Sequence, residues 1–207
     1  QDRAENTKLV ITVGGDGTIL RAVQLTAPNE IPVVGVNMGR LGFMTELQVH
    51  EALEKLPFYI NSDCRVEERY MIQATLVKAN GGVSEVGPCH ALNDVVLARG
   101  AVSRVVTITG YIDGAQLTTF RADAVILSTA TGSTGYNLAV GGPILDIASD
   151  SLVLKPVAAH MGLTAAMVLD HSANVSLSLE GYQPATLCVD GHVDHPLEPG
   201  DRVDLVQ

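Results

Sequence analysis

The residues best suited to chemistry lie in a glycine-rich loop, GGDGT, at residues 14–18. Gly14, Gly15 and Gly17 let the backbone turn sharply and approach a phosphate group closely. Asp16 would face whatever binds there, and a carboxylate repels a phosphate unless a cation or an acidic hydroxyl proton lies between them. The loop therefore predicts phosphate binding, with Asp16 as a Mg²⁺ ligand or as a general base that acts on an alcohol.

A plainer interpretation of Asp16 is that it closes the turn or caps a helix, as Asp does in many connections between a strand and a helix. The pentapeptide alone favours neither interpretation. Thr18 is predicted to cap the helix that follows. That helix would then direct free N–H groups and the positive end of its dipole at the same crevice.

A second loop rich in glycine and hydroxyl groups, TGSTGYNLAVGGP, occupies residues 131–143. Thr131, Ser133 and Thr134 predict the capped start of a short helix that runs to about Val140, where the GGP segment stops it. A cap needs a single hydroxyl, so we expect the surplus to line a ribose and its phosphates. Two such loops on one chain predict a nucleotide held from two sides.

The elements that must position these loops change character near Pro57. Residues 9–13 and 31–36 are short, continuous β-branched runs, as in parallel strands that are covered on both faces. A helical pattern follows each run, first from Thr18 and then over about residues 46–56. Open sheets of this kind bind ligands at the carboxyl ends of their strands, which is where GGDGT lies.

We therefore expect two domains. Residues 1–57 predict a Rossmann-like α/β domain that carries the GGDGT loop and is apparently truncated. Residues 58–207 predict an all-β domain, an antiparallel β-sandwich with a short helix after the second loop. Asp-Gly pairs at 113–114 and 190–191 predict hairpin turns with positive φ. Strand patterns cover residues 69–78, 94–98, 105–112, 117–127, 175–179, 186–189 and 202–206.

Composition narrows the possible partners. The chain has 13 Lys and Arg against 23 Asp and Glu, a formal net charge of −10, which is the wrong sign for binding nucleic acid. It has no apolar run long enough to cross a membrane and no signal-peptide pattern, so we expect a cytoplasmic protein without a membrane partner.

Neither the cysteines nor the histidines suggest a metal centre. The three cysteines are widely spaced and lack a CxxC pattern, so we expect them to be reduced and free of zinc. His192, Asp194 and His195 lack a fourth ligand, and we expect no metal site there.

The order and separation of the two loops, with Asn93 and Asp94 between them, resemble the NAD kinase family over nearly the whole chain. GGDGT also occurs in diacylglycerol and sphingosine kinases, but those lipid kinases lack the TGSTxY…GGP segment. The resemblance implies phosphorylation of the adenosine 2′-hydroxyl of NAD to give NADP. It also implies ATP or polyphosphate as the donor, with Mg²⁺ or another divalent cation.

The resemblance also implies roles for single residues. Asp16 would be the catalytic base, Phe43 would pack on the nicotinamide or adenine end of NAD, and Asn93 with Asp94 would hold the ribose. Arg104, Arg121 and Asp123 would line the same site, with one of them reaching in from a neighbouring subunit of a homodimer or homotetramer. The phosphate loop would comprise Gly14, Gly15, Gly17 and Thr18. The full set of NAD-binding residues would be Asp16, Gly17, Phe43, Asn93, Asp94, Arg104, Arg121, Asp123, Thr131, Thr134, Gly135, Tyr136, Ala139 and His192.

Plainer alternatives exist for several of these residues. Phe43 could be an ordinary buried phenylalanine, Asn93 with Asp94 could form an Asx turn, and Arg121 with Asp123, two apart in one predicted strand, could form a surface ion pair. The chain departs from the family pattern at Ala130, Gly135, Ala139, His192, Ala165 and Ala166. A non-catalytic NAD(P)-binding sensor stays as an alternative function because of these departures, and a lipid kinase stays as another because it would share the GGDGT loop.

Overall fold

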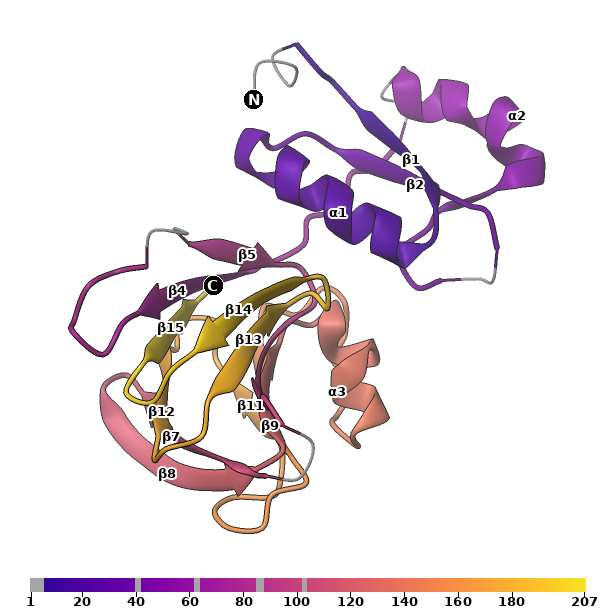
Figure 1. Ribbon diagram of the computed structural model, residues 1–207. Coiled ribbons are helices and arrows are strands. Elements are labelled where there is room, and N and C mark those ends of the chain that lie inside the picture. The colour runs from indigo at the N-terminus through magenta and orange to yellow at the C-terminus, as the bar shows by residue number, and fades with distance from the viewer. Residues whose placement is uncertain (1–5, 40–41, 62–63, 85–87, 102–103) are drawn as a thin grey trace. The chain divides into compact units, whose positions relative to one another are not determined.

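A short parallel sheet carries the GGDGT loop in the first of two units (Figure 1). The structure is a computed structural model that describes residues 6–39, 42–61, 64–84, 88–101 and 104–207. Its units comprise Gln1–Glu68 and Arg69–Gln207. The sheet has the order β1-β2-β3, with parallel pairs throughout. The elements of this unit are β1 (Val10–Gly14), α1 (Asp16–Thr26), η1 (Ala27–Asn29), β2 (Val33–Asn37), β3 (Leu47–Gln48) and α2 (Val49–Ile60).

Helices α1 and α2 pack on opposite faces of this sheet. Ile19 of α1 lies against Gly35 of β2, where a Cβ would come within 2.7 Å of the Ile19 side chain. Val34 and Val36 flank Gly35 and therefore face the other side, where they pack with Ala52 of α2. The predicted α/β arrangement is thus confirmed.

Helix α1 begins at Asp16, two residues before the predicted start. Gly15 is its N-cap and makes no side-chain cap bond, while the Thr18 amide donates to the Gly15 carbonyl at 2.8 Å. The Thr18 side chain folds back over Gly14, where a Cβ would overlap its hydroxyl. The prediction that Thr18 caps the helix is therefore wrong, because the glycines have already turned the chain before Asp16.

Helix α2 continues to Ile60 and contains Pro57, whereas the sequence pattern predicts an end near residue 56 and a change of domain at Pro57. The Asn61 amide donates to the Pro57 carbonyl at 3.0 Å, so a helical turn forms after the proline. A proline removes one N–H donor from a helix but leaves its carbonyl available. The first unit accordingly extends to Glu68.

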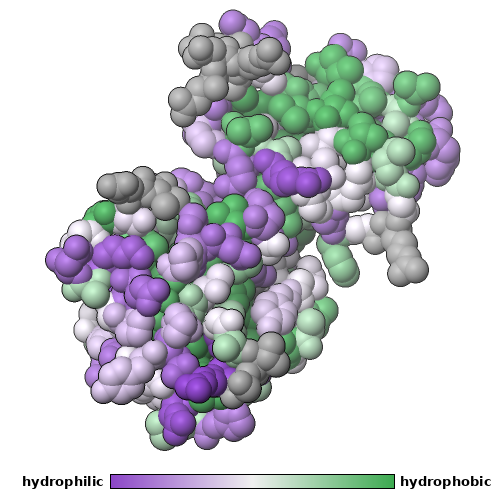
Figure 2. All heavy atoms as spheres, in the orientation of Figure 1, coloured by the Kyte–Doolittle hydropathy of each residue, from purple (hydrophilic) through white to green (hydrophobic). Residues whose placement is uncertain are grey.

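Large apolar side chains remain exposed on the first unit, and Figure 2 shows apolar groups on its surface. Ile11 and Val13 of β1 lie beside Val34 and Val36 in the sheet register, yet they are 41% and 58% exposed. Helix α2 therefore covers β2 and leaves the same face of β1 exposed.

The second unit is a sandwich of two six-stranded antiparallel sheets, as predicted. One sheet has the order β11-β10-β9-β6-β13-β14, and the other has the order β5-β4-β15-β12-β7-β8. The strands are β4 (Ile72–Val77), β5 (Cys89–Ala91), β6 (Asp94–Arg99), β7 (Val106–Ile112), β8 (Ala115–Ala122), β9 (Ala124–Ser128), β10 (Leu152–Val157), β11 (Met167–Leu169), β12 (Val175–Glu180), β13 (Ala185–Val189), β14 (Val193–Leu197) and β15 (Arg202–Val206).

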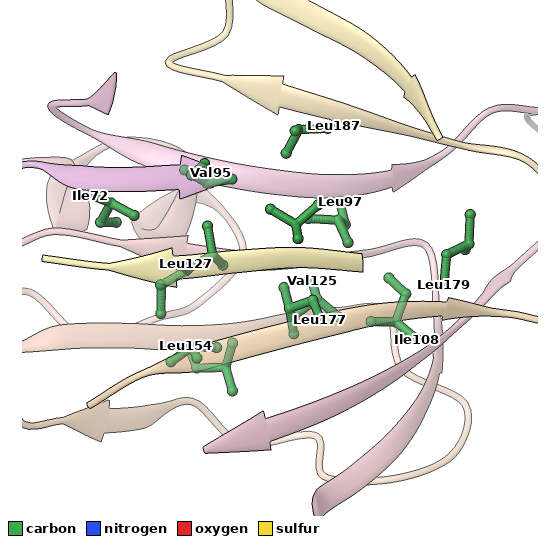
Figure 3. Packing of buried hydrophobic residues seen from close by; sticks show 14 of the residues in the cluster. Ile72, Val95, Leu97, Ile108, Val125, Leu127, Leu154, Leu177, Leu179 and Leu187 are labelled. Carbon is green, nitrogen blue, oxygen red and sulfur yellow. The ribbon is translucent and has the colours of Figure 1, made fainter. Parts of the chain in front are cut away.

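The main core lies between the two sheets. Strands β4 and β13 alternate buried and half-buried residues, as expected of strands with one face on a core. Figure 3 shows Leu97, Val125 and Leu177 among the side chains of this core, drawn from strands of both sheets. Strand β9 is buried along its whole length, because a smaller cluster around Ile126 packs on its other face with Val140. The second loop thus covers part of the outer face of β9 through Val140.

The predicted strand over residues 117–127 is in fact two strands, β8 and β9, in different sheets. Asp123 lies between them, where the chain crosses from one sheet to the other. Arg121 and Asp123 therefore do not share a strand face, and that prediction is wrong. The alternation on both sides of Asp123 is continuous in sequence, so periodicity alone did not reveal the break.

The predicted strand ranges do not include β5, β10, β11 or β14, although the hairpin turn predicted at residues 190–191 implies a strand after it. Pro156 in β10 and Pro196 in β14 argue against strands because proline cannot donate to a ladder. The structure accommodates both. Strand β14 lies at the edge of its sheet, and the pairing of β10 with β11 covers Leu152–Leu154 only and does not reach Pro156.

The two Asp-Gly hairpin turns are confirmed. Asp113 and Gly114 have φ of 50° and 78°, and Asp190 and Gly191 have φ of 51° and 69°. The first pair joins β7 to β8 and the second lies between β13 and β14. Positive φ is rare for residues other than glycine, and Asp tolerates it better than most.

The helical segments of the second unit are short, a 3₁₀ turn η2 (Gly132–Thr134) followed by α3 (Tyr136–Ala139). Helix α2 has only 12 residues. Within the part of the chain that the structure describes, no helix has the length and apolar character needed to cross a membrane.

Candidate functional site

Asp16, the first residue of α1, binds the loop that follows β2. Its two carboxylate oxygens accept the backbone N–H groups of Phe43 at 2.9 Å and Met44 at 3.2 Å. Gly42 makes room for this carboxylate, since a Cβ there would overlap it. Asp16 does not cap its own helix. It holds residues 42–44 against the GGDGT loop, and each carboxylate oxygen keeps a second lone-pair direction for a further donor.

The glycines of the first loop lie at the N-terminal end of α1. A Cβ on Gly15 or Gly17 would meet no atom within 4 Å, so the space beside both residues is open. The backbone N–H groups of a first helical turn have no partner within the helix and carry partial positive charge. This end of α1 can therefore receive a phosphate group.

Phe43 is 73% exposed, so the interpretation of Phe43 as a buried core residue is wrong. Its backbone is held by Asp16 while its ring stays at the surface. An exposed aromatic ring on an anchored loop can stack on a base or on another flat ring.

In the second unit, Asn93 and Asp94 lie at the start of β6 and are held by Asp190. The Asp190 carboxylate accepts the backbone N–H groups of Leu92 at 2.8 Å, Asn93 at 2.7 Å and Asp94 at 3.1 Å. Sequence reasoning recognised the turn at Asp190 but missed this role. The only local signal was the Asp-Gly pair, which reports backbone conformation and not the partner of the side chain.

The environment of Asn93 and Asp94 is buried and polar. Asp94 is 7% exposed, and burial together with the nearby charge of Asp190 raises the pKa of Asp94 to about 7. The Asn93 Oδ1 atom is buried and has no hydrogen-bond partner within the described part of the chain. A buried acceptor without a donor is unfavourable, so this atom is suited to a hydroxyl or amide of a ligand.

The second loop and the residues just before it pack directly on this segment. The Thr129 hydroxyl donates to the Leu92 carbonyl at 2.6 Å, and the Thr129 amide donates to the Asn93 carbonyl at 2.9 Å. A Cβ on Gly132 would overlap the same Asn93 carbonyl. The two motifs therefore form one packed arrangement in the second unit.

The hydroxyl groups of Ser133 and Thr134 hold the backbone of this loop, and the expectation that the Ser133 hydroxyl lines a ligand is wrong because it points inward. Ser133 is fully buried; its hydroxyl donates to the Ala130 carbonyl at 2.7 Å and accepts the Leu145 amide at 3.0 Å. The Thr134 hydroxyl donates to the Thr131 carbonyl at 3.3 Å. Neither η2 nor α3 has a side-chain cap bond, so the predicted cap is wrong as well.

Arg69 is a second residue that sequence reasoning missed. Its Nη1 donates to the Thr131 hydroxyl at 3.2 Å, across 62 positions of sequence. The contact places a guanidinium group beside the second loop. No local pattern around residue 69 indicates this contact, because it depends on how β4 enters its sheet.

Helix α3 and the glycine before it present three predicted binding residues at the surface. Gly135, Tyr136 and Ala139 are exposed, whereas Asn137 is buried and its amide donates to the Ser133 and Pro143 carbonyls at 3.0 and 2.8 Å. Asn137 thus anchors the helix from below. The exposed residues are free to meet a ligand.

Asp123 and Arg121 lie away from Asn93 and Asp94. Asp123 forms an ion pair with Arg99 at 3.3 Å, and both belong to the end of β6 and β9 opposite Asp94. Five residues of strand separate the two ends, which is about 16 Å. Arg121, in the other sheet, is exposed and lies opposite Thr107. Within a single chain, neither Arg121 nor Asp123 therefore lies close to Asp94.

Arg104 and His192 are both exposed. Arg104 precedes β7, and its amide lies 3.4 Å from the Ala101 carbonyl. His192 follows the Asp190 turn, with its ring Nδ1 3.0 Å from the Asp190 carbonyl.

The donor set of the described residues does not fit a metal held by the protein alone. Among residues 6–39, 42–61, 64–84, 88–101 and 104–207, no group of three or more His, Cys, Asp or Glu side chains is placed to hold a metal ion. We therefore derive no step through a metal cage of protein ligands.

Family models match both units of the chain. The ATP-NAD kinase C-terminal domain matches residues 92–207, and the ATP-NAD kinase N-terminal domain matches residues 1–64. A protein named NAD kinase from Dehalococcoides mccartyi is 38% identical over 205 residues, 99% of this chain and 72% of that protein. Another from Chloroflexus aggregans is 44% identical over 195 residues, 94% of this chain and 70% of that protein.

Two solved structures share the fold. Yeast NADH kinase complexed with NADH has a TM-score of 0.89 at 30% identity over 97% of this chain, which spans 58% of the yeast chain. An NAD kinase from Archaeoglobus fulgidus in complex with ATP has a TM-score of 0.80 at 23% identity, over 100% of this chain and 76% of that chain. At that lower identity the likeness concerns the fold alone.

Proposed function

Because this chain belongs to the ATP-NAD kinase family, we propose that it transfers a phosphoryl group from ATP to the adenosine 2′-hydroxyl of NAD, which gives NADP. The observation that carries the acceptor assignment is the buried, unpartnered Oδ1 of Asn93 beside the buried carboxyl of Asp94. Ribose hydroxyls are donors of the kind that these two groups need.

Asp16 is our candidate for the group that orients the 2′-hydroxyl and accepts its proton. In the step, the 2′-oxygen forms a bond to the γ-phosphorus of ATP, the bond from that phosphorus to the β–γ bridging oxygen breaks, and ADP leaves. The transition state of phosphoryl transfer is loose, so holding the attacking oxygen in line contributes more than removing its proton early. The N–H groups that Asp16 accepts from residues 43 and 44 hold its carboxylate still for that task.

The phosphate groups are assigned to Gly14, Gly15, Gly17 and Thr18 at the N-terminal end of α1. We propose that a divalent cation, most simply Mg²⁺, arrives with ATP. It would neutralise the donor phosphates. Polyphosphate in place of ATP is the alternative donor.

The other proposed contacts with NAD lie on surface loops and strand ends. Phe43 and Tyr136 offer exposed rings for its flat groups. Arg99 and Asp123 lie at the end of β6 and β9 opposite Asp94, so within one chain Asp123 does not reach the proposed ribose site. We therefore propose a homodimer or homotetramer, in which Asp123 would contact NAD bound to a neighbouring subunit. We further propose a cytoplasmic location, without nucleic acid or membrane partners. The remaining proposed contacts are Gly17, Arg104, Arg121, Asp123, Thr131, Thr134, Gly135, Ala139 and His192.

The test is product formation. The chain is incubated with NAD, Mg²⁺ and either ATP or polyphosphate, and NADP is measured with an NADP-specific dehydrogenase. NADP formed with one donor identifies that donor. NAD binding without product from either donor would favour a sensor, and phosphorylation of diacylglycerol in vesicles would favour a lipid kinase.

A further inference from the structure

A buried carboxylate that the proposed mechanism does not use lies beside Asn93. Three hydrogen bonds reach the Asp190 carboxylate from the N–H groups of Leu92, Asn93 and Asp94, and the Asp190 amide donates to the Asp94 carbonyl at 3.0 Å. We propose that Asp190 is a positioning residue for NAD, which holds the Asn93–Asp94 backbone in the conformation that receives the ribose. The inference rests on the proposed function, since it assigns that segment to NAD.

The hairpin turn by itself does not require this arrangement. Asp113 begins another Asp-Gly turn with φ of 50°, against 51° for Asp190, but Asp113 is exposed. Its carboxylate accepts hydrogen bonds from the backbone and side chain of Asn174 at the surface. The fold therefore makes the same turn twice and buries the carboxylate in only one of these two cases.

Burial of the Asp190 carboxylate is electrostatically unfavourable. Burial raises the pKa of Asp190, while the three backbone hydrogen bonds oppose that rise. The neighbouring Asp94 is also a buried carboxyl group, and two such groups side by side disfavour each other's charge. A local arrangement that lowers stability is typical of a site built for binding, because it fixes groups that water would otherwise leave free to move.

The same turn also reaches a further proposed NAD contact. His192 lies two residues after Asp190, and its Nδ1 is 3.0 Å from the Asp190 carbonyl oxygen. Asp190 thus contacts both strand ends of this region, the start of β6 through its carboxylate and the turn before β14 through its carbonyl. A substitution of the Asp190 side chain should disturb the contact with the start of β6 and leave the contact of its carbonyl with His192 intact.

The test compares Asp190→Asn with Asp113→Asn in the full chain. Asparagine tolerates positive φ, so both turns should form. In Asp190→Asn, one oxygen can still accept the amides of Asn93 and Asp94, but an NH₂ group replaces the acceptor of the Leu92 amide. NAD affinity is measured by calorimetry, the KM values for NAD and ATP by steady-state kinetics, and folding by thermal unfolding. Asp190→Gly, which also tolerates this backbone, serves as the second variant.

We expect Asp190→Asn to raise the Kd and KM for NAD by about 10- to 100-fold, because a small misplacement of a binding group has effects of that size. The KM for ATP should change little, and Asp113→Asn should change none of these values. Equal NAD affinity in Asp190→Asn and Asp113→Asn would overturn the inference. So would a rise of both KM values together, or failure of both Asp190 variants to fold.

Failure of the proposed function has a different signature. A parent chain that binds NAD without making NADP removes the kinase assignment, while the calorimetric comparison still decides the role of Asp190. A parent chain that does not bind NAD overturns both.

Discussion

Gly132 lies against Asn93 so closely that a Cβ on residue 132 would overlap the Asn93 carbonyl group. The same carbonyl accepts the Thr129 amide at 2.9 Å. The residue type at position 132 therefore controls the placement of a buried amide that is our candidate for binding ribose.

Gly132→Ala should destabilise the second unit by about 1–3 kcal/mol, because the added methyl group must displace well-packed backbone. It should also weaken NAD binding, since Asn93 would shift. Urea unfolding and calorimetry measure the two effects. Gly82→Ala is the matched control, because Gly82 is exposed, lies outside the proposed NAD contacts, and a Cβ there would meet only the Asn80 side chain, at 3.1 Å. Equal behaviour of the two variants would contradict the prediction.

Asn93→Ala should lower NAD affinity without lowering stability. Its Oδ1 is buried without a donor, so removing it relieves an unfavourable group in the free protein. In the complex the same change removes a hydrogen bond to the ribose, and we expect the KM for NAD to rise by about tenfold. The KM for ATP should change less. A large loss of thermal stability, or equal effects on both KM values, would show that Asn93 is a structural residue.

Asp16→Asn should lower kcat by about 10²–10⁴-fold, the range usual for loss of a general base, with NAD still bound. Asp170→Asn is a suitable control, because Asp170 also accepts a backbone amide, that of Ser172 at 2.9 Å, on an exposed turn. Single-turnover measurements separate chemistry from binding. Near-parental kcat in Asp16→Asn would leave Asp16 as only an anchor for residues 42–44.

Asp94 should make stability depend on pH. Burial and the charge of Asp190 raise the pKa of Asp94 to about 7 in the folded protein. Because this lies above the unfolded value, the protonated carboxyl stabilises the fold at low pH, and the stabilisation is lost as the pH rises through about 7. Asp94→Asn should therefore raise the free energy of unfolding more at about pH 8 than at about pH 5. We expect the two increases to differ by on the order of 1–3 kcal/mol. Chemical unfolding at both pH values checks this. Asp146→Asn, an exposed substitution, is the control and should show no such growth.

Asp201 should change the pH dependence of stability in the opposite direction to Asp94. It is 2% exposed and accepts Lys78 Nζ at 2.9 Å and the backbone amides of Ala79 and Glu198. Burial alone would raise the pKa of Asp201, but these hydrogen bonds outweigh it and hold the pKa below its ordinary value. Its stabilisation is then present above the unfolded pKa of about 4 and is lost as the pH falls through the folded value.

Asp201→Asn should accordingly lower the free energy of unfolding by about 1–3 kcal/mol near neutral pH, with a smaller loss in acid. Asp204→Asn, in β15 and paired with the partly exposed Arg202, should have a smaller effect. A loss that is independent of pH would mean that packing, and not charge, determines the role of Asp201.

Local patterns were enough for the elements that depend on neighbours in sequence. The β-branched runs before GGDGT and before residue 37 became parallel strands, because that pattern suits strands covered on both faces. The Asp-Gly pairs became turns with positive φ, since Asp and Gly tolerate that conformation. The break at Asp123 left no such signal, because an alternating pattern looks the same whether or not the strand changes sheets.

By itself, the sequence determined the two loop motifs, the family resemblance and the division into an α/β part and a β-sandwich. Each motif and each strand or helix pattern rests on residue types within a few positions of one another, and the resemblance rests on the order of the motifs along the chain. Tertiary structure alone decided that Ser133 turns inward, that Arg69 reaches Thr131, and that Asp190 holds the amides of Leu92, Asn93 and Asp94. The Asp190 partners lie 96 to 98 positions away, and the pairing of β13 with β6 brings them together. A side chain's conformational preference is local, but its hydrogen-bond partner depends on which strands pair, and that pairing is settled by burial of the whole core.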